Sequence, residues 1–539
     1  MTQRPIALLA ILLFAGLLAR AAWPPDETRN ADVARAIAAG DGWLVPMLHG
    51  TMYREKPPVF FWLSAAVVRL GAPVQAAPRA VAGAAALATL LLLPAIAAAL
   101  GLPRAAATRA GWVLAASPLF LVYAQIGMVD TTATACVTAA IAAKLARADR
   151  AGGARALLVA LEGVALAAAL LTKGPVLLLF PIGLRLGAAL ARERSPASAD
   201  RSDLAAFGLA LGIGGAWLLA AANVAGSQYV QAIGPRQVFR RVTGRAPHLR
   251  PPGFLIGVTL LGLLPWLLLG APLGRLRSRW REAGSARPGA SQAALLGWIL
   301  LPALLLSLLR TQQPHYLLPA LPAAALLLGQ AVDRPERWAT RGTAALALLV
   351  SGVLLLHAIA APLFPDAPAE LASATDLATR AVAALAATLL LALVLLPAAA
   401  RLAPWVRAAI GMGILAVCVL FALARLDAWM LPRALLASGA VVRADRLAAP
   451  QNVRSTVRIL SGRSEVDKSV RKRIRAWLAE GPGRVALMWE SEYLRLESEA
   501  SVAGRESDVI EIGRGTLRGR SLVAVRAAPT PATEPDRIR

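Results

Sequence analysis

The feature that most limits how this chain can fold is a succession of apolar runs, each long enough to cross a bilayer. A transmembrane helix needs about 17–25 predominantly apolar residues, and roughly thirteen stretches reach that length. Their apolar residues are continuous and do not alternate with polar ones, which excludes a transmembrane β-barrel. The runs lie near residues 5–22, 78–100, 110–127, 131–147, 156–172, 174–191, 204–222, 253–273, 291–309, 315–332, 342–363, 378–398 and 407–425.

The composition agrees with an all-α polytopic membrane protein. Of 539 residues, 57% are hydrophobic, and the mean hydropathy is +0.59. The runs are rich in Ala, Leu and Val, which suits close helix packing in lipid. Residues 5–22 resemble the apolar part of a signal peptide, but Trp23-Pro24-Pro25 is a poor cleavage context. We therefore expect a retained first span and a membrane domain over residues 1–428.

The net charge of +26 does not indicate nucleic-acid binding. Lys and Arg are scattered singly or in small groups between the apolar runs, a pattern typical of loops that anchor helices among membrane lipids. The two cysteines, Cys136 and Cys418, both fall inside apolar runs. They support neither a disulfide framework nor a cysteine metal site.

The basic residues also orient the helices. A cytoplasmic N-terminus places about eighteen arginines, Arg147 among them, in cytoplasmic loops, as the positive-inside rule requires. An odd number of spans then puts the C-terminus on the outer side. Residues 57–71 are too short for a span and predict an interfacial helix within the first outer loop, 23–77. The other polar outer loops are 127–132, 172–175, 228–253 and 310–316.

The composition changes after the last span. Residues 429–527 contain a helical pattern in "SEVDKSVRKRIRAWLAEG", a strand in "RVALMW" and a hairpin in "SDVIEIGRGTLRGRSLVAVRA". The sequence predicts a small C-terminal α/β domain on the outer side. Residues 528–539 have the composition of a disordered tail.

Two carboxylates lie at the outer ends of predicted helices. Asp26 follows Pro24-Pro25 where an N-cap belongs, and Asp130 precedes the run that starts at residue 131. Either could simply cap a helix. Alternatively, a carboxylate held at the membrane surface can act as a general base. Because both lie on one face at one depth, a shared site is the sharper hypothesis.

A basic group on the outer face departs from the positive-inside rule. Lys173 lies in the tight turn of "LLTKGPVLL", where it either anchors a helix end or holds a phosphate as a point charge. An anionic lipid substrate would account for the group. Its other members are Lys56, Arg236, Arg240, Arg241, Arg245 and Arg250.

Metal binding is only weakly indicated. His248, His315 and Glu55 come from distant outer loops, and their spacing fits no familiar metal motif. We predict no required metal or other cofactor.

Two charges fall inside predicted spans. Glu162 and Arg185 are symmetric about the turn at 173–174, so an antiparallel hairpin would bring them to matching depth. We predict a structural ion pair in preference to a proton relay.

The outer loops resemble those of the ArnT-like, protein-mannosyltransferase-related glycosyltransferases of the GT-C class. The longest match is "DETRNADVARAIAAGDGWLVPMLHGTMYREKPPVFFW", with its "DETR" and "EKPP" elements. Further matches follow in order over the first 330 residues: "MVDTT", "LTKGPVLLLFP", "GLLPW" and "RTQQPHYLLPALPAAALLLG". The remainder of the chain matches mainly in layout.

The resemblance implies an inverting transfer from a polyprenyl-phosphate sugar to a cell-envelope acceptor at the periplasmic face of a bacterial inner membrane. It implies that Asp26 is the catalytic carboxylate, with Glu55 and Asp130 in the same cavity. Residues implied to bind the donor phosphate are Lys56, Lys173, Arg240 and Tyr316. Residues implied to line the cavity are Arg29, Arg236, His248 and His315.

The chain departs from the family pattern at two places. Asn30 replaces the usual tyrosine after "DETR", and residues 234–241 lack the acidic and histidine residues common before the arginine. The best-known activity of this branch is transfer of 4-amino-4-deoxy-L-arabinose to lipid A phosphates. The alternatives are a protein or polysaccharide hydroxyl acceptor, and a lipid-linked-sugar transporter. A transporter would place polar groups on broken helices near the midplane.

Overall fold

The computed structural model describes residues 21–191, 195–243, 249–251, 253–264, 266–270, 289–332, 337–360, 377–396, 401–425, 433–463, 465–469, 471–481, 483–502, 507–517 and 520–528, with residues 7 and 10. The predicted first span at 5–22 and the predicted tail at 528–539 therefore lie almost wholly outside the described residues. The chain divides into two compact units. The first comprises Met1–Arg20, Val33–Pro365 and Thr375–Ala424, and the second comprises Ala21–Asp32, Asp366–Ala374 and Arg425–Arg539.

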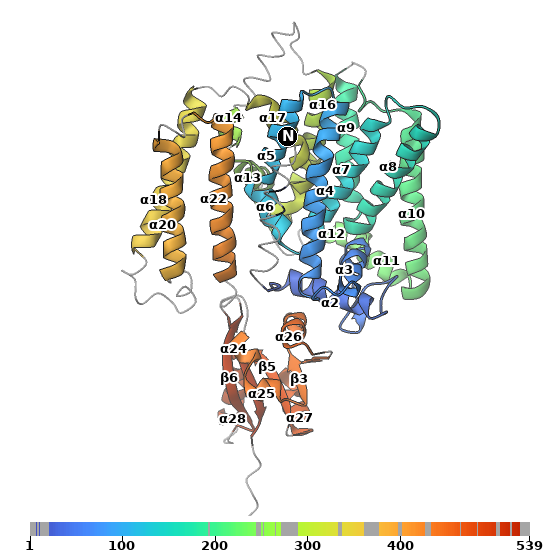
Figure 1. The fold of residues 1–539 in the computed structure, drawn as a ribbon. Helices are drawn as coiled ribbons and strands as arrows, with labels where there is room; N and C mark the ends of the chain where they lie inside the picture. The colour runs from blue at the N-terminus through green and yellow to red at the C-terminus, as the bar shows by residue number, and fades with distance from the viewer. Residues whose placement is uncertain are drawn as a thin grey trace, which may run out of the picture. The chain divides into compact units, whose positions relative to one another are not determined.

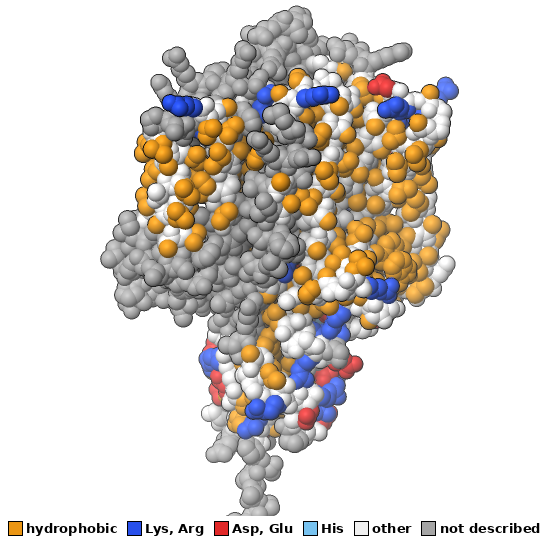
Figure 2. All heavy atoms as spheres, in the orientation of Figure 1, with side chains coloured by type: hydrophobic (Ala, Val, Ile, Leu, Met, Phe, Trp, Pro, Cys, Tyr) orange, Lys and Arg blue, Asp and Glu red, His pale blue; other side chains and the backbone are white. Residues whose placement is uncertain are grey.

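The first unit is a helical bundle (Figure 1). Among the described residues, five helices are long and apolar enough to cross a membrane. Hydrophobic side chains dominate the visible surface of this unit, and Lys and Arg lie at the edges of that apolar band (Figure 2). The chain is thus a multi-pass membrane protein. The five helices are α4 (Ala77–Ala99), α7 (Val129–Ala146), α8 (Gly152–Lys173), α10 (Arg201–Ala225) and α16 (Ala290–Ser307).

The predicted span at 110–127 is a bent pair of helices. α5 (Arg104–Ala115) and α6 (Pro118–Gln125) meet at an angle of 59°. Pro118 cannot donate a backbone hydrogen bond and disfavours helical geometry at the preceding Ser117, so the helix breaks there. The prediction of a span over 110–127 did not include this break.

Two other predicted spans begin with a 3₁₀ turn that continues into an α-helix. The run at 174–191 is a short 3₁₀ turn, η1 (Pro175–Leu178), followed by α9 (Leu179–Leu190). The run at 315–332 likewise begins as η2 (Pro314–Ala320) and continues as α17 (Leu321–Ala331). The remaining helices of the bundle are α13 (Phe254–Gly262), α14 (Trp266–Gly270), α18 (Arg337–Ala360), α20 (Leu377–Leu395) and α22 (Pro404–Arg425).

Glycines bring α9 and α16 into very close contact. A Cβ atom added to Gly187 would lie 2.0 Å from the carbonyl oxygen of Ala293, and one added to Gly297 would lie 2.1 Å from that of Gly183. Small residues four positions apart on both helices therefore let the backbones touch, as is common between membrane helices. The indole of Trp298 donates a 2.9 Å hydrogen bond to the carbonyl of Pro319, which fixes α16 against η2.

The first loop folds into short elements. It contains α2 (Asp26–Ala38), the two-stranded ribbon β1 (Met47–Leu48) and β2 (Thr51–Met52), and α3 (Val59–Arg69). Within the first unit, Ile37, Tyr53, Phe60 and Phe61 form a buried cluster. Trp43 stacks on Trp62 with 4.8 Å between ring centroids. These contacts make the loop a packed cap built from aromatic side chains.

Short helices continue the chain between α10 and α13. They are α11 (Ser227–Ile233) and α12 (Pro235–Val242). Tyr229 of α11 is fully buried, and burial raises the pKa of its hydroxyl to about 12.

A network of buried charges joins α7, α8, α9 and α10 at the end of these helices opposite Asp130. Arg185 pairs with Glu162 and lies 2.8 Å from Asp203, so the predicted Glu162–Arg185 ion pair is confirmed. Arg147 also pairs with Glu162 and Asp203, and Lys144 lies 3.1 Å from Asp200. Arg147 is 0% exposed, so it is a buried partner and not the solvent-facing loop anchor that we expected.

The second unit contains a five-stranded mixed sheet with the order β4-β3-β5-β7-β6. β3 pairs in parallel with β4 and β5, whereas β7 pairs antiparallel with β5 and β6. β5 and the β6–β7 hairpin coincide with the predicted strand and hairpin. The strands are β3 (Arg446–Ala449), β4 (Asp467–Lys468), β5 (Arg484–Trp489), β6 (Val509–Leu517) and β7 (Arg520–Ala527). The helices are α24 (Arg433–Leu436), α25 (Gly439–Val442), α26 (Arg454–Ser461), α27 (Arg471–Ala479) and α28 (Glu490–Val502).

Candidate active site

A buried ion pair forms the centre of the candidate site in the first unit. Asp130 lies in the first turn of α7, and Lys173 is the last residue of α8. Because α7 and α8 form an antiparallel hairpin, the start of one meets the end of the other. The two side chains form a hydrogen-bonded ion pair, with Asp130 1% exposed and the Lys173 side chain 6% exposed. Gly174, with φ +97°, allows α8 to stop directly after the lysine.

Two aromatic residues of η2 complete this cluster. His315 Nε2 lies 3.7 Å from Asp130 Oδ1, and Lys173 Nζ lies 5.1 Å from the centre of the Tyr316 ring. The lysine therefore interacts with a carboxylate and with the π face of a tyrosine. Of the predicted site residues, Asp130, Lys173, His315 and Tyr316 lie together.

Tyr123, at the end of α6, is a member of the cluster that sequence reasoning missed. Its hydroxyl lies 3.3 Å from His315 Nδ1, and the two rings meet edge to face with 5.2 Å between centroids. The available signal was its position near the end of the predicted run 110–127, seven residues before Asp130. The break at Pro118 changes the direction of α6 and brings the tyrosine here.

Gln312 was also missed, and it holds the segment that precedes η2. Its side-chain oxygen accepts a hydrogen bond from the backbone N–H of Leu255, and its amide nitrogen donates to the carbonyls of Ser307 and Leu309. These contacts tie the end of α16 to α13. They fix the chain three residues before His315.

The cluster has unused hydrogen-bonding capacity. Asp130 Oδ2 and the hydroxyls of Thr131 and Thr132 are buried without a hydrogen-bond partner within the described part of the chain. Buried polar atoms of this kind are unusual in folded proteins and call for a functional explanation. A polar ligand with hydroxyl or phosphate groups could satisfy them.

Glu55 and Lys56 follow the ribbon of the first loop. The hydroxyl of the buried Tyr53 donates a 3.3 Å hydrogen bond to Glu55 Oε2, while Glu55 itself is exposed. The half-buried Lys56 lies close enough to interact electrostatically with Asp130. Lys56 therefore links the first loop electrostatically to the buried pair.

Asp26 and Arg29 belong to the second unit and pair with each other at the start of α2. The Asp26 side chain is 42% exposed. We expected Asp26 to cap this helix. In the structure, it is the Glu27 side chain that bonds to the residues before the helix. Its Oε2 accepts a 2.8 Å hydrogen bond from the backbone N–H of Trp23. The Asp26 carboxylate is thus left exposed beside a guanidinium.

Three of the predicted arginines of the fourth outer loop, at 236, 240 and 241, lie on α12. Arg236 and Arg240 are both exposed there. His248, like Arg245, lies outside the described residues. Across the described part of the chain, no group of three His, Cys, Asp or Glu side chains could hold a metal ion.

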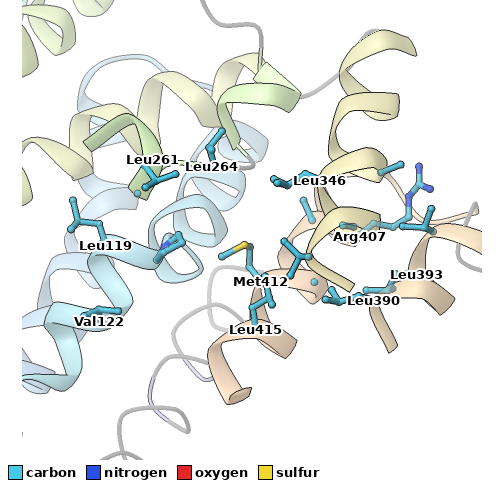
Figure 3. Close-up of a pocket in the computed structure, with 18 of the residues that line it drawn as sticks. Leu119, Val122, Leu261, Leu264, Leu346, Leu390, Leu393, Arg407, Met412 and Leu415 are labelled. Atoms are coloured by element: carbon cyan, nitrogen blue, oxygen red, sulfur yellow. The ribbon is translucent and has the colours of Figure 1, made fainter. Parts of the chain in front are cut away.

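An apolar cavity of about 580 Å³ (Figure 3) has Tyr123 of the cluster in its wall. Its lining comes from α6, α13, α18, α20 and α22, and is almost entirely leucine, valine, alanine and other apolar side chains. Tyr123 and Pro314 belong both to this wall and to the neighbourhood of His315. Arg407, at the start of α22, is a charged residue of the lining. The cavity is suited to an aliphatic chain.

Comparison with known proteins places this architecture. Residues 55–212 match the family described as dolichyl-phosphate-mannose-protein mannosyltransferase. The crystal structure of ArnT from Cupriavidus metallidurans bound to undecaprenyl phosphate has the same fold, with a TM-score of 0.73, 98% of both chains covered and 19% identity. The fold is therefore that of the ArnT structure, and the sequence over residues 55–212 resembles the mannosyltransferase family.

The chain is also similar in sequence to two named aminoarabinose transferases, in line with the resemblance of its outer loops. The undecaprenyl phosphate-α-4-amino-4-deoxy-L-arabinose arabinosyl transferase of Edwardsiella ictaluri is 30% identical over 349 residues, which are 61% of this chain and 59% of that protein. The protein of the same name in Pseudomonas aeruginosa is 31% identical over 364 residues, 65% of this chain and 64% of that protein. The chain therefore matches about three fifths of the length of these relatives.

Proposed function

We propose that this protein transfers 4-amino-4-deoxy-L-arabinose, with inversion, from undecaprenyl phosphate to lipid A phosphates at the periplasmic face of the inner membrane. The observation that carries the proposal is the buried Asp130–Lys173 pair, with His315 and Tyr316 beside it and an apolar cavity adjoining it. A charged site next to an aliphatic one suits a lipid phosphate. The names of the relatives supply the sugar.

The donor phosphate would bind to Lys173. An ammonium has three donors, and its contact with Asp130 uses one of them. The phosphate is the leaving group, so its charge grows as the sugar–phosphate bond breaks, and cations already in place lower the barrier. Lys56, Arg240 and Tyr316 would assist, and no metal is needed.

The polyprenyl chain would occupy the cavity beside Tyr123. Burying an aliphatic chain there removes apolar surface from water at roughly 25 cal/mol per Å². The volume of about 580 Å³ accommodates part of a long prenyl chain, and the rest would lie in lipid.

Asp26 would act on the acceptor. Its exposed carboxylate at the start of α2 is available to an incoming substrate. If the acceptor is an already ionised phosphate, Asp26 and Arg29 orient it and no proton needs to be removed. The substrate cavity would also be lined by Glu55, Arg236, His248 and His315.

We also propose a topology of about thirteen spans, with the N-terminus in the cytoplasm. The loop 23–77, the site and the C-terminal domain would then lie in the periplasm. An accessibility scan of single cysteines in intact cells tests this: probes at Thr51 and Lys468 should react with an impermeant reagent, and a probe at Asp149 should not.

The deciding experiment uses the purified protein with a panel of undecaprenyl-phosphate sugars and lipid A. We expect turnover of the aminoarabinose donor, and its loss in Lys173→Gln and Asp26→Asn. Lys468→Gln, which removes an exposed lysine of β4, is the matched control and should stay fully active. Turnover by Lys173→Gln at the normal rate would contradict the assignment of the phosphate site.

A hydroxyl acceptor is the second candidate, because the matching family is described as a protein mannosyltransferase. Asp26 would then be a true general base and would have to take a proton. Lipid A from cells with and without the gene separates the two. An added pentosamine mass that requires the gene supports the first function, and its absence under inducing conditions favours the second.

A further inference from the structure

We propose that the C-terminal domain positions the catalytic helix α2, through an ion pair between Arg458 and Asp32. This inference rests on the proposed role of Asp26 in catalysis. Arg458 lies on α26 of the domain, and its Nη1 donates to both carboxylate oxygens of Asp32, at 3.1 and 3.4 Å. Asp32 is 1% exposed, although α2 begins in a polar loop.

A second contact lies one helical turn nearer to Asp26. The hydroxyls of Thr28 and Thr456 are 3.1 Å apart, and both residues are buried. Thr28 and Asp32 are four residues apart, so they lie on the same face of α2. α26 therefore holds two successive turns of α2, at residues that the phosphate site does not use.

α26 is itself fixed within its domain. Arg454, in its first turn, donates to the carbonyl of Val466 at 2.7 and 3.0 Å, immediately before β4. Val453 and Val457 belong to the hydrophobic core that the sheet forms with its helices. A helix anchored in this way transmits the position of the sheet to α2 as a rigid element.

Asp26 stands at the free end of the clamped helix. It lies six residues before Asp32, about 9 Å along the axis at 1.5 Å per residue. Asp32 is buried and already paired, so it has no free group to offer a substrate. Its effect on the reaction would be to fix the direction from which Asp26 and Arg29 meet the acceptor. Arg458 and Asp32 are therefore positioning residues.

A kinetic test separates positioning from binding. In the full-length purified protein, Arg458→Ala and Asp32→Asn should lower kcat by about 10- to 100-fold, the effect expected of a misplaced reacting group. KM for the donor should change less than twofold, because the proposed donor-phosphate residues lie on other elements. Arg458→Lys should recover part of kcat.

The matched control is Arg446→Ala in the same domain. It removes an exposed ion pair with Asp467, whose Nη2–Oδ2 distance is 2.8 Å, and it should leave kcat unchanged. Normal kcat in Arg458→Ala would overturn the inference, as would equal losses in Arg458→Ala and Arg446→Ala.

Combination with Asp26→Asn tests whether Arg458 acts through Asp26. If it does, Arg458→Ala should cause no further loss in the Asp26→Asn protein, whereas independent effects would multiply. Full activity of Asp26→Asn alone would refute the role proposed for Asp26. An inactive Asp26→Asn with a fully active Arg458→Ala would refute only the positioning role.

A disulfide that replaces the Arg458–Asp32 ion pair tests whether Arg458→Ala acts through the position of α2 and not through misfolding. Thr28→Cys and Thr456→Cys, in an Arg458→Ala protein whose Cys136 and Cys418 are changed to Ala, would place two thiols within disulfide reach. Oxidation by oxidised glutathione should restore kcat, and reduction by dithiothreitol should remove the gain. A disulfide that forms without restoring kcat would overturn the proposal.

Discussion

The Asp130–Lys173 pair yields the sharpest prediction about stability. Both side chains are almost completely desolvated, with exposures of 1% and 6%. Removal of one partner leaves a buried charge without its counterion, which costs about 3–5 kcal/mol. Replacement of both by neutral groups removes that penalty. Lys173→Met and Asp130→Asn should each destabilise the protein by this amount, and the double variant should be far more stable than either.

The coupling energy follows from a double-mutant cycle. If each single change costs about 4 kcal/mol and the double change about 2 kcal/mol, the interaction term is about 6 kcal/mol in magnitude. The exposed Arg446–Asp467 pair offers a control cycle, whose term should be below about 1 kcal/mol. Unfolding by sodium dodecyl sulfate in mixed micelles measures these free energies.

The cycle belongs in a His315→Gln background, where no imidazole 3.7 Å from Asp130 can replace part of the lost lysine charge. Additive single and double changes would refute the reasoning, since they would mean that the two charges do not depend on each other. The double variant should remain inactive even where it is stable, because Lys173 is also assigned to the donor phosphate.

Three further predictions concern the bundle and its charges. Gly187→Ala should cost about 1–3 kcal/mol, because its Cβ would lie 2.0 Å from a carbonyl oxygen of α16, whereas Gly208→Ala meets nothing within 4 Å and should not destabilise. Thermal unfolding in detergent measures both. Glu162→Gln should destabilise the protein, because it leaves the buried Arg147 and Arg185 short of a counterion; an unchanged unfolding temperature would contradict this pairing. Burial raises the pKa of Asp200, but the hydrogen bond and charge of the α7 lysine outweigh it and hold that pKa at about 2. Its stabilising effect should therefore be present above about pH 4 and disappear between pH 4 and 2, so the unfolding temperatures of wild type and Asp200→Asn should converge there.

The apolar runs predicted helix positions well. The spans expected at 78–100 and 291–309 are Ala77–Ala99 and Ala290–Ser307. Hydropathy measures the length of an apolar segment and does not show where a helix changes direction. The 59° bend between α5 and α6 was therefore not foreseen. The proline at 118 was the signal, but a proline inside an apolar run also occurs in the continuous α4, at Pro94.

The candidate site was predictable where a charge lay beside a turn. Asp130 and Lys173 stand at opposite ends of neighbouring runs, and the hairpin makes them partners. Tyr123 and Gln312 were missed, because the role of an uncharged side chain in or beside an apolar run depends on which residues pack against it. The count of basic residues in loops likewise treated Arg147 as a loop anchor. The sequence shows that Arg147 lies at the end of an apolar run, but it does not show that the side chain is buried.

The charge network of α7 to α10 has a consequence for how the chain enters the membrane. Arg185 on α9 needs Glu162, which precedes it in the chain, and Asp203, which is synthesised after it. A charged residue left at the centre of a helix costs about 2.5–3.5 kcal/mol on insertion scales. We therefore expect α9 to remain at the translocon until α10 has been synthesised and Asp203 can pair with Arg185. Loss of Asp203 should thus appear first as a defect in biogenesis, before any defect in turnover.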